Sequence, residues 1–187
     1  MTSTSNVTTV LKCLRDLCGD RRGVAAVEFA IIVPFMLALY IGGVELGDGM
    51  AIQVKVTDTA HIVADITTQN TSINNATMLN ILNASTATIA PYSSSNIIVT
   101  ISEVSTNSSG VATVTWSDSF NGAARTIGQP MTLPTSLAGQ ANISLILGEV
   151  AYTYTPNLGG SITGTVSISD SYYLFPRNST SITRVNS

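Results

Sequence analysis

The residue in this sequence best suited to chemistry is Glu28, a carboxylate inside an otherwise apolar stretch. The stretch runs from Val24 to Leu46, and Glu28 and Glu45 are its only charged residues. A carboxylate placed in lipid costs roughly 2.5 to 3.5 kcal/mol on insertion scales. Glu28 therefore needs a partner or a function, unless its side chain merely snorkels to the near interface. Glu45 lies at the far end of the stretch, where solvation is easy, so it is less informative.

A second polar set, Asp58, His61 and Asp65, has a spacing that would place all three residues on one helical face. Carboxylates and imidazole bind cations, but three ligands on one helix make an incomplete site. A solvated polar face is the favoured interpretation. The two thiols, Cys13 and Cys18, are too sparse for a zinc site without further partners. We predict no metal and no other cofactor.

The remaining residues lack the parts that most catalytic sites need. The chain has one His and two Cys, and its carboxylates after residue 71 are Glu103, Asp118, Glu149 and Asp170. The sequence shows no Gly-rich phosphate loop, nucleophile elbow or carboxylate pair spaced for acid–base catalysis. No basic cluster follows residue 22, so nucleic-acid binding lacks its electrostatic footprint. The sequence therefore predicts a protein that is not an enzyme and has no nucleic-acid partner.

The apolar stretch from Val24 to Leu46 is expected to cross a membrane. It exceeds the roughly 20 residues that a helix needs to span a bilayer. Half of the eight basic residues precede it, namely Lys12, Arg15, Arg21 and Arg22. The positive-inside rule therefore predicts a cytoplasmic N-terminus and an exported C-terminal part. A secretory signal peptide is disfavoured, because its apolar core is shorter and a small-x-small cleavage site would follow it.

Beyond the span, one apolar stripe predicts that the helix continues to about Gln69. Its members recur at spacings of four and three residues: Ile52, Val56, Thr59, Val63 and Ile66. The single proline of this helix, Pro34, lies in the membrane part, where a kink can be accommodated. A helix with one apolar stripe needs a partner to cover it.

The C-terminal part is rich in Ser, Thr and Asn, carries few charges and predicts one short helix followed by a sheet. The helix is expected around Asn74–Asn83, with Met78, Ile81 and Leu82 on one face. The strand candidates are Ile97–Ile101, Val111–Ser117, Ser144–Tyr154 and Ser161–Leu174, joined by turns at Thr106–Gly110 and Pro156–Gly160. We expect Phe120–Gln140 to be mostly loop, and Trp116, Tyr172 and Tyr173 to pack on the sheet rather than bind a ligand.

These elements together predict an α+β fold. A single N-terminal transmembrane helix continues into a long amphipathic helix, whose stripe packs on a small antiparallel sheet. The predicted divisions are a basic N-terminal segment over 1–23, the span over 24–46, an extension of the helix over 47–70 and the exported domain over 71–187.

The run RRGVAAVEFAIIVPFMLALYIGGVELG, Arg21 to Gly47, resembles the N-terminal segment of TadE-like pseudopilins of the tight-adherence (Tad) pilus system, a branch of the type IV pilus superfamily. The matching features are Gly23 after basic residues, Glu28 with Phe29, Pro34 in the span, and the pair Val44 and Glu45. The stretch Ala151–Arg177 also resembles the end of such proteins, and the middle of the chain gives no resemblance.

This resemblance implies a pilin-like fold and a leader peptide, residues 1–23, that a prepilin peptidase removes between Gly23 and Val24. Gly23 offers that peptidase an unhindered cut site, and the cut creates a new α-ammonium on Val24. By analogy with pilins, Glu28 would meet the ammonium of a neighbouring subunit, while Phe29 and Pro34 complete the motif for recognition and assembly. The implied partners are the peptidase, other Tad pilins and pseudopilins, the inner-membrane assembly platform and the bilayer.

Two functions from different classes therefore stand at the level of sequence. One is a minor pseudopilin at the inner membrane, with a periplasmic C-terminal domain, that takes part in pilus assembly and surface adhesion. Whether it stays at the base of the pilus or enters the filament is left open by the sequence. The other is an uncleaved, membrane-tethered periplasmic or surface binding module. An intact leader on the mature protein would favour the second.

Overall fold

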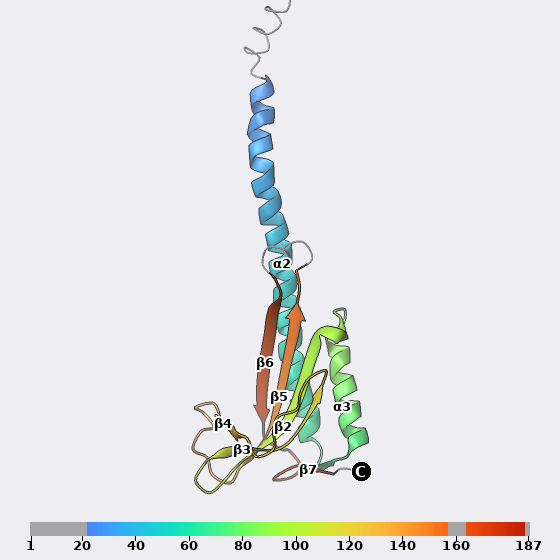
Figure 1. The fold of residues 1–187 in the computed structure, drawn as a ribbon, viewed down its shortest axis with the longest axis vertical. Helices are drawn as coiled ribbons and strands as arrows, with labels where there is room; N and C mark the ends of the chain where they lie inside the picture. The colour runs from blue at the N-terminus through green and yellow to red at the C-terminus, as the bar shows by residue number, and fades with distance from the viewer. Residues whose placement is uncertain (1–21, 157–163, 186–187) are drawn as a thin grey trace, which may run out of the picture. The chain divides into compact units, whose positions relative to one another are not determined.

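The computed structural model describes residues 22–156 and 164–185, and the chain divides into two units, one ending at Val44 and one beginning at Glu45. Most of the predicted leader, both cysteines and residues 157–160 of the predicted turn lie outside the described residues. Figure 1 labels the helices and strands along the chain, from α2 to β7.

The unit that ends at Val44 contains the first part of helix α2, which begins at Arg22 and ends at Thr68. No residue from 23 to 44 is buried, and the most apolar window of the helix has a mean hydropathy of 2.3. A helix that is apolar on all sides needs lipid or other helices around it. Within the described chain, this is the one helix long and apolar enough to cross a membrane.

The unit that begins at Glu45 contains a five-stranded sheet in the order β4-β3-β2-β5-β6, and each neighbouring pair is antiparallel (Figure 1). The strands are β2 (Ile97–Thr106), β3 (Ala112–Phe120), β4 (Pro130–Met131), β5 (Ser144–Tyr154) and β6 (Val166–Leu174). A short 3-10 helix, η1 (Ser94–Asn96), leads into β2. The α+β class and the four predicted strands are confirmed.

Three strand boundaries differ from the prediction. β2 continues to Thr106, beyond the predicted Ile101 and into the first residue of the predicted turn. β3 continues to Phe120 although Ser117–Ser119 is polar, because hydroxyl pairs join it to β2: Ser117 with Ser102 at 2.8 Å and Ser119 with Thr100 at 3.0 Å. β6 begins at Val166, later than the predicted Ser161. The expected loop from Phe120 to Gln140 is mostly irregular, but it contributes the two-residue strand β4.

The predicted packing of α2 on the sheet is confirmed within this unit. The stripe residues Ile52, Val56, Thr59 and Val63 are fully buried and Ile66 packs against the same core. Gly148 of β5 permits the close approach, because a β-carbon there would lie 2.6 Å from the carbonyl oxygen of Ala60. Helix and sheet thus bury one another's apolar faces.

Helix α3 runs from Asn75 to Thr88, five residues beyond the predicted end at Asn83. It begins as expected, since the Asn74 side chain accepts a hydrogen bond from the Thr77 amide at 2.8 Å. The last turn is rich in Ser and Thr, which favour helix ends in isolation. Burial of Ser85 and its hydrogen bond to the Leu82 carbonyl keep this turn helical.

The chain end forms a second, parallel pairing that the sequence did not predict. β1 (Ser72–Ile73) pairs with β7 (Thr183–Arg184) to make a two-stranded sheet. A further small core lies around Val104, Leu133, Leu145 and Leu147, apart from the main cluster. Both features depend on contacts between segments far apart in sequence.

Candidate functional site

The predicted cleavage bond, between Gly23 and Val24, lies in the first turn of α2. A β-carbon built on Gly23 meets nothing within 4 Å. Both residues are exposed, which is the accessibility that a cut site requires.

Glu28 follows Val24 by four residues, so the two lie one turn apart on the same face of α2. Glu28 is exposed, and within the described chain it makes no hydrogen bond or ion pair. A carboxylate on an apolar helix with no partner among the described residues is costly in lipid unless another molecule supplies a partner or the side chain snorkels to the interface. The structure thus brings Gly23, Val24 and Glu28 together at one end of the helix.

Phe29 and Pro34, the other motif residues, are exposed on the same helix. Pro34 lies within α2 and has no amide hydrogen to donate to the carbonyl of Ala30. The helix continues through it, as expected for a proline in a span where neighbours can satisfy the carbonyl. Both residues are available to a partner rather than used in the fold of the described chain.

The carboxylates of the sheet all have structural partners. Glu103, only 2% exposed, accepts hydrogen bonds from the Ser144 hydroxyl at 2.6 Å and the Ile182 amide at 2.8 Å. Asp170 accepts one from the Thr57 hydroxyl at 2.5 Å. Glu103 thus joins β2 to β5 and to the segment before β7, and Asp170 joins β6 to α2.

Glu149 and Asp118 each pair with an arginine. Arg125 donates two hydrogen bonds of 2.6 Å to the Glu149 carboxylate, and this bidentate contact raises the pKa of Arg125. Arg184 donates to Asp118 at 2.9 and 3.2 Å. A catalytic carboxylate would instead face a substrate, so all four candidates are accounted for as structural groups.

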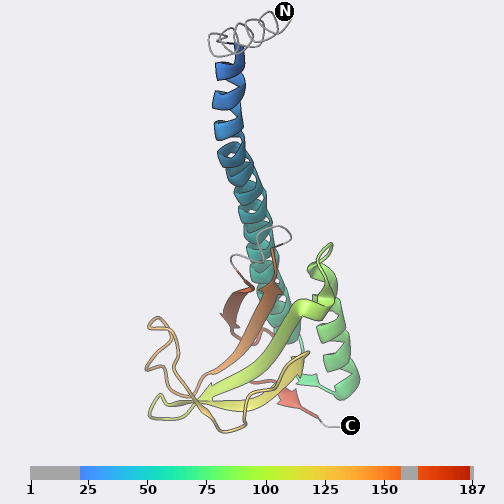
Figure 2. The same ribbon diagram turned by 45° about the horizontal axis from the view of Figure 1, so that its top comes forward.

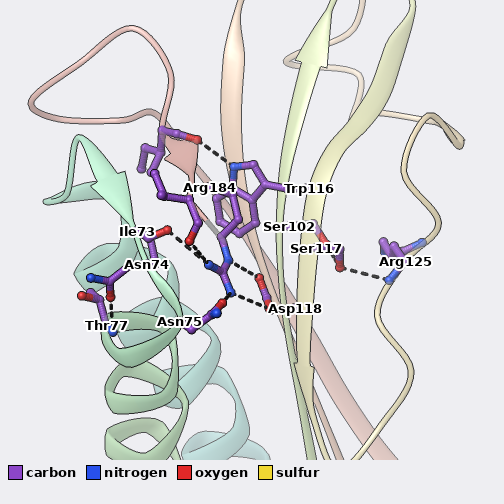
Figure 3. Close-up of polar contacts among 12 residues, drawn as sticks. Ile73, Asn74, Asn75, Thr77, Ser102, Trp116, Ser117, Asp118, Arg125 and Arg184 are labelled. Atoms are coloured by element: carbon purple, nitrogen blue, oxygen red, sulfur yellow. Dashed lines mark hydrogen bonds and ion pairs between the residues drawn. The ribbon is translucent and has the colours of Figure 1, made fainter. Parts of the chain in front are cut away.

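The Arg184 guanidinium fixes the chain end (Figure 3). Besides Asp118 it contacts the Asn75 side chain at 2.7 Å and the Ile73 carbonyl at 3.3 Å, while the Trp116 indole donates to the Ile182 carbonyl at 2.7 Å. Sequence reasoning placed Trp116 in sheet packing, which is right, but missed this cluster. Its partners are more than 60 residues apart in sequence, so no local signal could reveal it.

The polar face Asp58, His61 and Asp65 does not converge on one point. Asp65 forms an ion pair with Arg177, and the His61 ring meets Tyr172 edge-on at 5.0 Å. Within residues 22–156 and 164–185, no group of three or more His, Cys, Asp or Glu side chains is placed to hold a metal ion. His61 and Asp65 thus have different neighbours, and Asp58 is exposed.

Glu45 and Asp48 lie near the phenol of Tyr154, in the unit that begins at Glu45. Burial raises the pKa of Tyr154, and the two carboxylates raise it further. The carboxylate of Glu45 therefore acts on the phenol of Tyr154 at the end of β5. The sequence did not predict that these two residues are neighbours.

These features define a class: an α+β protein with one exposed apolar helix and a carboxylate near its start. The family model described as TadE-like protein matches residues 23–65. This match confirms the predicted resemblance to TadE-like proteins over these residues. The match does not extend to Ala151–Arg177, so that part of the resemblance stays a prediction. No curated protein and no solved structure matches the chain.

The apolar helix α2 fits a single-pass membrane protein. The matched residues include Gly23, Val24, Glu28, Phe29 and Pro34, the residues that the sequence singled out.

Proposed function

We propose that this chain is a minor pseudopilin that a prepilin peptidase cuts between Gly23 and Val24. The mature protein takes part in assembly of a Tad-type pilus and, through it, in surface adhesion. The observation that carries this proposal is the TadE-like match, which begins at Gly23 and includes Glu28 on an exposed apolar helix.

Cleavage gives Glu28 the partner that it lacks within the described chain. The new α-ammonium on Val24 is a cation at the membrane face, and charge-assisted hydrogen bonds between such groups are strong in a medium of low dielectric constant. Pairing between the ammonium of one subunit and Glu28 of the next would set the axial position of adjacent helices. The exposed apolar side chains from Val24 to Val44 then pack on neighbouring helices or lipid.

The orientation follows from the charges. The basic residues before Val24 stay in the cytoplasm and the sheet enters the periplasm, so the protein is inserted in the inner membrane before assembly. Its proposed partners are the prepilin peptidase, other Tad pilins and pseudopilins, and the inner-membrane assembly platform.

The decisive experiment is the N-terminal sequence and intact mass of the protein from native membranes, in cells with and without their prepilin peptidase. The proposal expects a mature chain that begins at Val24 only when the peptidase is present. An intact N-terminus in both strains would leave the uncleaved, tethered binding module as the better account.

A second experiment separates processing from assembly. Glu28→Gln removes the negative charge but keeps the size of the side chain, and we expect pilus formation to fall at least tenfold. Glu45→Gln is the matched control, because it removes the other carboxylate of the apolar stretch and lies at the end where solvation is easy. Normal processing and normal pili in Glu28→Gln and Glu28→Ala would contradict the mechanism.

The tethered binding module makes the opposite prediction for a domain exchange. Replacing residues 1–46 by an unrelated membrane anchor would preserve the function of a binding module. Under the pseudopilin proposal it abolishes function, because the cut site and Glu28 are lost together.

A further inference from the structure

β6 forms one edge of the five-stranded sheet. It pairs with β5 from Val166 to Leu174 and with no other strand in the part of the chain that the structure describes. The outer side of an edge strand presents a row of backbone donors and acceptors that another strand can satisfy. At nine residues, β6 offers a long row of this kind.

The opposite edge is covered in part. Its strand β4 has two residues, one of which is Pro130, and Pro blocks strand addition because it has no amide hydrogen. Beyond β4, the backbone of Val114 is already bonded to the loop, to the Gly128 amide at 2.8 Å and the Gln129 carbonyl at 3.1 Å. β6 contains no Pro, Lys or Gly. β4 and the loop thus occupy the part of this edge formed by Ala112, Thr113 and Val114, whereas no second strand lies beside β6 among the described residues.

An exposed apolar stripe of α2 lies beside the edge formed by β6. Met50 and Val54, which follow the predicted span, are 64% and 60% exposed and lie one turn apart. Thr57 follows Met50 by seven residues and His61 follows Val54 by seven, so both continue the same side of the helix. Thr57 bonds Asp170 and His61 meets Tyr172, which shows that this side of α2 borders β6. Figure 2 shows the two elements side by side.

The same surface is acidic. Asp58 follows Val54 by four residues and is exposed, and Asp170 lies in the middle of β6. A partner that covers both carboxylates must supply a cation or hydroxyl donors near them. Only an extended segment can satisfy the row of backbone groups, since a helix has used its own.

We propose that the edge of β6 and the stripe formed by Met50 and Val54 make one binding surface for an extended strand of another protein. The strand alternates apolar with polar residues. Its apolar side chains cover the stripe and Tyr172, and it carries a basic residue near Asp58 and Asp170. This inference goes beyond the proposed function, because it uses only the unit from Glu45 and does not depend on cleavage.

The test places a photocrosslinking phenylalanine analogue at Val166 or Tyr172 of the full chain in native cells. Both side chains are exposed and belong to β6, six residues apart, which is about 20 Å along a strand. The analogue at Val111, exposed outside this surface, is the control. Mass spectrometry of the crosslinked peptides identifies the partner residues reached from each position.

The spacing of those partner residues decides the outcome. A strand places residues about six apart opposite the two positions, whereas a helix would place residues about 13 apart there. Strand spacing in one segment of another protein, with a basic residue within it, supports the proposal. Helical spacing, peptides from a second copy of this chain, or no product above the Val111 control would each overturn it.

A charge variant tests the apolar stripe of α2 independently of the backbone hydrogen bonds at the edge of β6. Val54→Lys should lower the crosslink yield from Tyr172 about tenfold, because the new ammonium repels the partner's basic residue and replaces an apolar contact. Leu79→Lys is the matched control, since Leu79 is 57% exposed on α3. Equal yields from the two variants, at equal amounts of folded protein, would contradict a role for the stripe. Intact crosslinking in cells without the prepilin peptidase would show that this surface acts even if the proposed cleavage does not occur.

Discussion

The two parts of α2 use similar residues in opposite ways. From Gly23 to Val44 the helix carries Val, Ile, Leu and Phe on all sides, and none of them is buried. From Ile52 to Ile66, the sheet covers one stripe of apolar residues, while Val54 on another side of the helix stays exposed. A helix that is apolar all round is suited to lipid and other helices, and a helix with one stripe is suited to a single partner. The pattern of apolar residues, rather than their number, distinguishes the two environments.

The sharpest test of this contrast is a pair of truncations. Ile52→Ala should lower the free energy of unfolding by about 3 kcal/mol, because Ile52 is fully buried against the sheet. Met50→Ala, two residues away and exposed, should change it by less than about 0.5 kcal/mol. Urea unfolding of the full chain in detergent micelles, followed by the fluorescence of the single Trp116, measures both. Equal losses would mean that the sheet does not cover this stripe.

Two glycines give the next largest difference. Gly148→Ala places a β-carbon 2.6 Å from the Ala60 carbonyl, so we expect a loss of about 2 kcal/mol as helix and sheet separate. A β-carbon on Gly47 of α2 meets nothing within 4 Å, so Gly47→Ala should be neutral or stabilise by up to about 1 kcal/mol. The same unfolding assay measures the pair. A tolerated alanine at position 148 would show that the close approach is not tight.

The more buried ion pair should also contribute more to stability than the more exposed one. The Arg184 side chain is 12% exposed and has three further hydrogen bonds, so Arg184→Met should cost about 1.5 kcal/mol. Arg125→Met removes a pair whose side chains are 31% and 27% exposed and should cost less than about 1 kcal/mol. Thermal unfolding followed by circular dichroism compares the two losses of stability. A larger loss for Arg125→Met than for Arg184→Met would contradict the role of Arg184 in holding the C-terminal segment.

The smallest expected effect is a loss of stability at alkaline pH. Burial raises the pKa of Tyr173 above its usual value of 10.0, and Glu149 raises it further while Arg125 opposes this. A raised folded-state pKa contributes stability below the unfolded pKa and loses it as the pH rises through the folded value. Tyr173→Phe should therefore reduce the fall in stability above about pH 10. An unchanged pH profile, measured by urea unfolding at several pH values, would exclude this group as a cause.

Much of this fold could be predicted from local patterns. The stripe of α2, the Asn74 cap and the four main strands are written in the spacing of apolar and polar residues, and the structure bears them out. The ends of elements were less predictable. α3 exceeds its predicted end because Ser85 is buried, and β3 extends because hydroxyls pair across strands. These extensions depend on partners that a local pattern does not contain.

The sequence by itself determined the apolar helix with its single proline, the position of Glu28 and the resemblance to TadE-like proteins, because each depends only on residue types and spacing along one continuous segment. Only the tertiary structure decided which carboxylates are structural, how Arg184 and Trp116 hold the chain end, and which strands form the edges of the sheet. These properties arise from segments brought together by folding, and their contacts are set by distance in space rather than by order in the chain.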